Sequence, residues 1–155
     1  MTLREGLAEY YQVNPGLSEP SKITNRKSAT YFHNHDTTHV VFGTHTGLLD
    51  EAVNDYLTFF CVDIRARDYI VGFFATDESK KIAKQSFFKL EIVRVFWRSL
   101  KLLPRIWRHR KRMTKRWPWT PPAELMDRPL AEIRAEYGIE PFRPEVVLGL
   151  AGPTE

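Results

Sequence analysis

Two histidines and two acidic residues lie close together in the N-terminal half of the chain. His35, Asp36 and His39 form the pattern HDxxH. Glu51 follows after eleven intervening residues. Positions i and i+4 share one face of a helix, so the imidazoles of His35 and His39 can point at the same atom. A carboxylate from a neighbouring helix commonly completes such a set in helical bundles, so the spacing predicts a metal site formed by these four residues.

Histidine nitrogens and carboxylate oxygens suit several divalent metals. Zn²⁺ is the first expectation for this site, with Fe²⁺ and Mn²⁺ as alternatives, because ligand type alone does not choose among them. Adjacent side chains on a straight helix diverge by about 100°. Asp36 therefore either binds the ion or orients an imidazole from behind it, and the sequence leaves both roles open.

Other motifs share some of these residues but fit less well. Zinc proteases use HExxH with Glu as the general base, and Asp at that position is one methylene shorter. Metal phosphohydrolases of the His-Asp type need a further upstream His and a distant Asp, and His33 is too close to serve. The plainest alternative is a hydrogen-bonded structural His-Asp pair, which would leave the spacing of Glu51 without a reason.

The residues around the cluster predict the elements that would position it. A helix over residues 28–42 carries HDxxH, and a second helix over residues 48–66 carries Glu51 in its first turn. Gly43 and Gly47 bracket the turn between them. Asp50 and Asp55 are expected to be helix N-terminal or solvated charges.

The remaining segments also predict helices. Thr2 and Glu5 fit a capping box for a helix over residues 3–12. Residues 69–75 are expected to be helical, and a last short helix is expected between Asp127 and Gly138.

A long helix is predicted to begin at Thr76 or Asp77 and to continue past Arg112, with a kink or break at Pro104. Its apolar stripe is expected to consist of Phe88, Ile92, Val95, Phe96, Leu100, Leu103 and Trp107. The sum is an all-α fold, a compact single-domain helical bundle with a long kinked helix.

Length and composition agree with one such domain. The chain has 155 residues, 43% apolar and 27% charged, and we expect a domain over residues 1–142 followed by a tail over 143–155. Cys61, the single cysteine, lies in an apolar run and is expected to be a buried structural thiol. No signal peptide or membrane-spanning run is recognisable, so the expected location is the cytoplasm.

Basic and aromatic residues concentrate in one segment. Ten of the 23 Lys and Arg residues lie between residues 92 and 123, where there is no Asp or Glu, and Trp97, Trp107, Trp117 and Trp119 lie among them. This pattern is typical of a helix that lies on an anionic membrane surface, here expected to be that of the inner (cytoplasmic) membrane. Solvated arginines covering the core are the structural alternative, and a nucleic-acid partner is disfavoured because no reading module accompanies the charges.

The motif as a whole resembles that of the Coq-four family of ubiquinone (coenzyme Q) biosynthesis proteins. The resemblance rests on HDxxH followed by Glu51 after eleven intervening residues, and on residues 126–141, which are similar to the C-terminal "PL…R…GI" helix of that family. The family usually has Gly where this chain has Asp50, and larger apolar residues at Thr37 and Thr38. The metal cluster is complete despite these differences, whereas the substrate is open to another prenylated or lipidic molecule.

The resemblance implies a function. It implies that the four cluster residues hold a divalent metal beside a prenyl-tailed quinone precursor, and that the chemistry is oxidative decarboxylation of the head group. The alternative is a non-catalytic lipid-binding scaffold of a quinone biosynthesis complex, in which the metal pins two helices. A homodimer is a further expectation. The aromatic residues expected to line the lipid cavity are Tyr56, Phe59, Phe60, Phe87, Phe88, Phe96 and Trp97.

Overall fold

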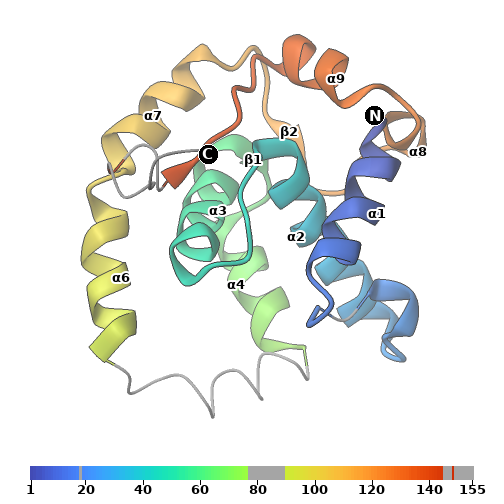
Figure 1. Cartoon of the computed structure of the whole chain (residues 1–155), viewed down its shortest axis with the longest axis horizontal. Coiled ribbons are helices and arrows are strands. Elements are labelled where there is room, and N and C mark those ends of the chain that lie inside the picture. Colours follow the sequence, from blue (N-terminus) through green and yellow to red (C-terminus); the bar gives the residue numbers. More distant parts are fainter. Residues whose placement is uncertain (18, 77–89, 145–147, 149–155) are drawn as a thin grey trace.

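The computed structural model describes residues 1–17, 19–76, 90–144 and 148, and in this part the chain is mostly helical (Figure 1). The elements in chain order are α1 (Leu3–Val13), η1 (Pro20–Lys22), α2 (Arg26–Phe42), α3 (Leu48–Cys61), β1 (Val62–Asp63), α4 (Ala66–Phe74), α6 (Leu90–Leu100), α7 (Leu103–Arg112), β2 (Trp117–Pro118), α8 (Ala123–Met126) and α9 (Leu130–Tyr137). The all-α prediction is confirmed. In Figure 1, α3 lies in the middle of the molecule, packed against α2, α6 and α7, and α1 packs on α2.

Helix α2 begins and ends where its sequence provides caps. The side chain of Asn25 accepts hydrogen bonds from the backbone N–H groups of Lys27 and Ser28, which satisfies donors that the first turn leaves unpaired. Gly43 ends the helix with φ of 73°, a left-handed conformation that favours glycine. The helix is mostly buried, so HDxxH lies on an element that is held on several sides.

Helix α3 is shorter than the predicted range of 48–66. It ends at Cys61, because Val62 turns to an extended conformation and pairs with Trp117 in a short parallel ladder between β1 and β2. The chain then enters α4, which confirms helix in the region 69–75. Local periodicity could not reveal the two short strands, since their pairing joins segments more than 50 residues apart.

The predicted long helix is two helices in the described region. Pro104 lies in the first turn of α7, where its missing N–H costs nothing, and the chain breaks just before it. The predicted apolar stripe is partly wrong, because Phe96 and Trp107 are exposed while Leu102 and Ile106 are buried. The predicted beginning of this helix at Asp77 lies outside the described residues.

One hydrophobic cluster joins both ends of the predicted domain, from Leu3 to Phe142, and Leu148 of the predicted tail also packs against it. Cys61 is completely buried in this cluster, which confirms the expected structural thiol. Burial raises the pKa of its thiol to about 12, so the group stays protonated at neutral pH. None of the helices that the structure describes combines the length and apolar character that crossing a bilayer requires.

The C-terminal segment holds the end of α2. The guanidinium of Arg134 on α9 donates to the backbone carbonyls of Val40 and Val41 at 2.8 and 2.9 Å. The backbone N–H of Phe142 donates to the carbonyl of Phe42 at 2.7 Å. The last turn of α2 has carbonyls without helical partners, so these contacts satisfy them and tie residues 130–142 to the helix that carries HDxxH.

Replacing Arg134 with Met is expected to lower the free energy of unfolding by about 2 kcal/mol, because two buried carbonyls lose a charged donor. That corresponds to a fall of roughly 4–8 °C in the midpoint of thermal unfolding, measured by circular dichroism. Arg128→Met is the matched control, since Arg128 makes an ion pair with Glu136 at the surface and such pairs contribute little. Equal melting of the two variants would show that the carbonyl contacts do not hold α9 to α2.

Candidate metal centre

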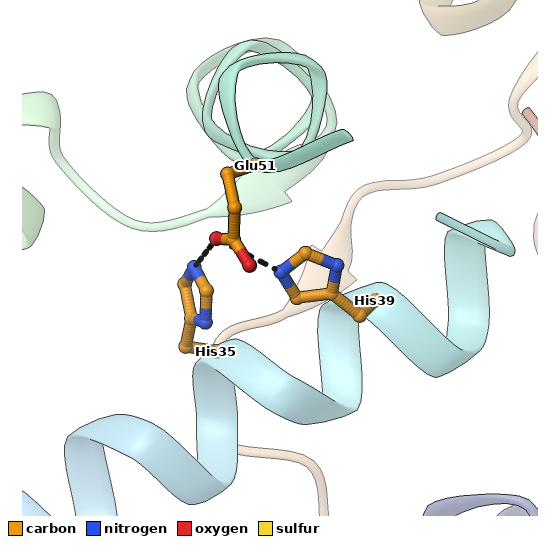
Figure 2. A group of neighbouring side chains, drawn as sticks. All are labelled: His35, His39 and Glu51. Atoms are coloured by element: carbon orange, nitrogen blue, oxygen red, sulfur yellow. Dashed lines mark ion pairs between the residues drawn. The ribbon is translucent and has the colours of Figure 1, made fainter. Parts of the chain in front are cut away.

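Three of the four predicted ligands converge on one point. His35 and His39 project from successive turns of α2, and Glu51 reaches them from the first turn of α3 (Figure 2). Oε2 of Glu51 lies 3.4 Å from Nε2 of His39 and 3.7 Å from Nε2 of His35. One donor atom from each residue lies within 4.8 Å of the others.

The turn between α2 and α3 brings Glu51 to this position. Gly43 closes α2, and α3 begins after Gly47. The carboxylate of Asp50 is buried and accepts a hydrogen bond from the backbone N–H of His45 at 2.9 Å. Asp50 lies in the first turn of α3, which confirms the expected helix N-terminal charge, but it is buried rather than solvated and braces the connecting loop.

Asp36 lies behind the site. It is buried, and its Oδ1 is 3.4 Å from Nδ1 of His35, the ring nitrogen that faces away from Glu51. Its Oδ2 accepts a hydrogen bond from the hydroxyl of Tyr11 at 2.7 Å. Of the two roles left open for Asp36, this position suits the orienting one, because a carboxylate at Nδ1 leaves the lone pair of Nε2 available.

Thr44 has the same relation to His39. Its hydroxyl oxygen lies 2.9 Å from Nδ1 of His39 and donates to Oδ1 of Asn54 at 3.4 Å, so the oxygen can accept from an Nδ1–H. Nε2 then carries the lone pair that a metal requires. This nitrogen is buried without a hydrogen bond, and the carboxylate of Glu51 is at ion-pair distance rather than in hydrogen-bond geometry. A buried unsatisfied nitrogen is costly unless something binds it.

Asn54 connects the two helices beneath the ligands. Its amide donates to the hydroxyl of Thr38 at 2.9 Å, and the Thr38 hydroxyl donates to the carbonyl of His35 at 2.6 Å. Sequence reasoning missed Thr44 and Asn54. Asn54 had a signal, since it lies three residues after Glu51 and therefore on the same helical face. Thr44 had none, because it lies in a loop.

The charged groups of the site shift one another's pKa values even without an ion. Burial on its own would lower the pKa of His35, but the hydrogen bond with Asp36 and the charge of Glu51 outweigh it, and the pKa is raised. Burial would raise the pKa of Glu51, but the neighbouring imidazole of His39, with that of His35, lowers it. Glu51 is therefore held as a carboxylate, the form that binds metals.

The donor set fits zinc. Ligands about 2.0–2.1 Å from a tetrahedral ion are roughly 3.3 Å apart. The two nitrogen–oxygen distances of 3.4 and 3.7 Å are close to that spacing. Three ligands leave a tetrahedral ion with a further position, which is the arrangement of catalytic rather than structural zinc sites. The same ligands also suit Fe²⁺ and Mn²⁺.

The site borders a cavity of about 460 Å³ between α2, α3 and α4. Its walls are mostly apolar, and its lining residues are Leu17, Tyr31, Phe32, His35, Asp36, Leu48, Glu51, Asp55, Phe59, Tyr69, Ile70, Phe73 and Phe74. A larger and more polar hollow lies on the other side of Tyr31 and Phe59, and none of the three ligands lines it.

The prediction of which aromatic residues line this cavity is mostly wrong. Of the predicted residues that the structure describes, Phe59 alone lines it, whereas Phe60, Phe96 and Trp97 are exposed. Tyr56 packs against the core, and residues 87 and 88 lie outside the described part of the chain. The walls come instead from α2 and α4, because α4 turns back against α2.

Replacing Thr44 with Val is expected to weaken zinc binding about 10- to 100-fold, because His39 loses the partner that sets its tautomer and ring orientation. The dissociation constant would be measured by competition with a chromogenic chelator. Thr46→Val is the control, since the Thr46 hydroxyl belongs to the same loop but bonds to Asn14 rather than to a histidine. Identical zinc affinity in both variants would remove Thr44 from the site.

Comparison of the chain with models of protein families, with curated proteins and with solved structures found no match. The resemblance in the sequence motif therefore stays a prediction.

Proposed function

We propose that the protein binds a divalent metal, with Zn²⁺ first, and a prenyl-tailed quinone precursor in the adjoining cavity, as in ubiquinone biosynthesis. The single observation that carries the proposal is the position of His35 and Glu51, which belong to the metal cluster and also line the apolar cavity. A lipid tail in this cavity would place its polar head beside the ion. Volumes of this order are usual for small-molecule sites.

Each part of the site has a task in this proposal. His35, His39 and Glu51 hold the ion, and Asp36 and Thr44 orient the two imidazoles. Phe73 and Phe74 of α4 belong to the walls that keep water from the tail. When bound, the ion supplies Lewis-acid polarisation of a head-group oxygen. The reaction that the sequence resemblance implies is oxidative decarboxylation of the head group.

The alternative is a scaffold that binds lipid without catalysis. In that case the ion would have a closed shell of four ligands and would only join α2 to α3. Cobalt-substituted protein titrated with azide separates the two, because an open position binds azide and shifts the visible absorption bands. Spectra that azide leaves unchanged would favour the scaffold.

A membrane surface is the proposed source of the lipid. Phe96 and Trp97 of α6 and Trp107 of α7 are exposed, and arginines and lysines lie among them in the sequence. Aromatic side chains can enter the head-group region while the cations attract anionic lipids. We therefore place the protein at the cytoplasmic face of the inner membrane.

A cavity-blocking variant tests lipid binding. Native mass spectrometry would count geranylgeranyl-hydroquinone bound to the zinc-loaded protein, to Ile70→Trp and to Val71→Trp. Ile70 lines the cavity, whereas its neighbour Val71 is exposed and does not. We expect one bound lipid in the parent and in Val71→Trp, and a loss of about tenfold or more in Ile70→Trp. Equal binding by both variants, or none by the parent, would refute the cavity as the lipid site.

A further inference from the structure

A third carboxylate faces the cavity besides Glu51 and Asp36. Asp55 lies one helical turn after Glu51 on α3, so the two side chains share a face. Both line the cavity, and Asp55 does so among the apolar walls formed by Phe59, Ile70 and Phe73. It was expected to be a helix-terminal or solvated charge, but in the structure it lies in the wall of the cavity.

Among the described residues, Asp55 has one hydrogen-bond partner. The hydroxyl of Tyr69 on α4 donates to its Oδ1 at 2.5 Å. Tyr69 is buried and its ring stacks on that of His35, so this pair lies directly beside the metal cluster. Burial raises the pKa of Asp55 even though the Tyr69 hydrogen bond lowers it, which means that the carboxylate is not fully compensated.

Apart from the histidines of the cluster, the described walls of the cavity hold no cation beside Asp55. None of the described residues that line it is Lys or Arg. An ionised carboxylate accepts several hydrogen bonds, and Tyr69 supplies one. A donor brought by the ligand would compensate the rest, and a donor held in an apolar cavity is a strong source of specificity.

We propose that Asp55, oriented by Tyr69, accepts a hydrogen bond from a hydroxyl group on the head of the bound ligand. This inference rests on the proposed function and deepens it. It defines the ligand class as an apolar tail on a head that carries a free hydroxyl, with that hydroxyl about one helical turn from the metal ligands. A ligand of the same shape whose hydroxyl is capped as a methyl ether is a poor match.

The test compares 4-octylphenol with 4-octylanisole, which differ by that cap. Their dissociation constants would be measured by displacement of a fluorescent apolar dye, with zinc and again after chelation. We expect the parent to prefer the phenol on the order of tenfold in both conditions. In Asp55→Leu the preference should fall to about one, while the affinity for the ether is kept.

Three further variants make the result specific. Asp55→Asn keeps an acceptor oxygen and should keep part of the preference, which serves if Asp55→Leu does not fold. Tyr69→Phe removes the hydroxyl that orients Asp55 but keeps the carboxylate, so the preference should fall without reaching one. Asp63→Leu is the control, since Asp63 lines the neighbouring hollow instead.

The outcomes distinguish a failure of this inference from a failure of the proposed function on which it rests. A phenol preference that exists only with zinc would assign the hydroxyl to the metal, and one that persists in Asp55→Leu would assign it to another group. Either result would overturn the role of Asp55. Equal binding of phenol and ether by the parent would overturn it as well, while leaving the lipid cavity intact. Failure of both probes to bind the parent would remove the proposed function and this inference together.

Discussion

Zinc is expected to raise the midpoint of thermal unfolding by roughly 5–10 °C when free zinc is about 100 times its dissociation constant. The reason is linkage, because the ion binds ligands that only the folded chain brings together. His35 and His39 come from α2 and Glu51 from α3, so the folded state gains about 2.7 kcal/mol under that condition. Differential scanning calorimetry with and without a chelator measures the shift.

Loss of one ligand should abolish this stabilisation. Glu51→Gln keeps the size of the side chain and removes its charge, and we expect its zinc affinity to fall by more than the 10- to 100-fold typical of supporting residues. At the same zinc concentration its melting point should then be unchanged by the metal. His39→Ala tests the ligands from α2, although it also leaves a cavity where a fully buried ring was.

Glu9→Gln is the control for charge, because Glu9 is an exposed residue of α1 away from the cluster. It should show the full zinc shift. An equal shift in Glu51→Gln and Glu9→Gln, or none in the parent, would reduce HDxxH to a structural pair. The lipid-binding scaffold without a metal would then be the better explanation of the cavity.

Gly138→Ala is expected to lower the free energy of unfolding by about 2–4 kcal/mol, or roughly 5–15 °C in melting temperature. Gly138 ends α9 with φ of 67°, which a side chain strains. An added Cβ would also lie 2.7 Å from the carbonyl oxygen of Arg112 and 3.1 Å from Cα of Met113. Both are backbone atoms at the C-terminal end of α7, so no side-chain rotation relieves the contact.

Gly16→Ala provides the comparison within the same chain. Gly16 has no positive φ, and nothing lies within 4 Å of the position of an added Cβ. Its replacement should change stability by less than about 0.5 kcal/mol. Thermal melting curves of the two variants, recorded under the same conditions, compare the two effects. A Gly138→Ala protein with the same melting temperature as Gly16→Ala would contradict the packing of α9 on the end of α7.

Features that depend on neighbouring residues were predictable from sequence. Thr2 and Glu5 form the expected capping box at the start of α1. Gly43 and Gly138 end their helices in the left-handed conformation, and Pro104 marks the break before α7. Each of these depends on backbone geometry within one turn, which residue types largely determine.

The cluster of His35, His39 and Glu51 was predictable for a similar reason. The histidines are one turn apart on one helix, and a short turn separates that helix from the one that carries Glu51. Few arrangements of two consecutive helices are possible with so short a connection, and in the antiparallel one their facing side chains meet. The spacing alone was therefore enough to bring the three side chains together.

Tertiary structure decided what surrounds that cluster. The pairing of Val62 with Trp117, the hold of Arg134 on the end of α2, and the contact of Tyr69 with Asp55 join segments that local patterns treat as independent. The cavity walls also depend on tertiary packing, since they include residues of α4 where the sequence predicts residues of α6. Hydrophobic periodicity shows that a residue faces other parts of the protein, but packing between distant segments determines which ones. Here the packing of α4 enclosed the carboxylate of Asp55 beside the cluster of His35, His39 and Glu51.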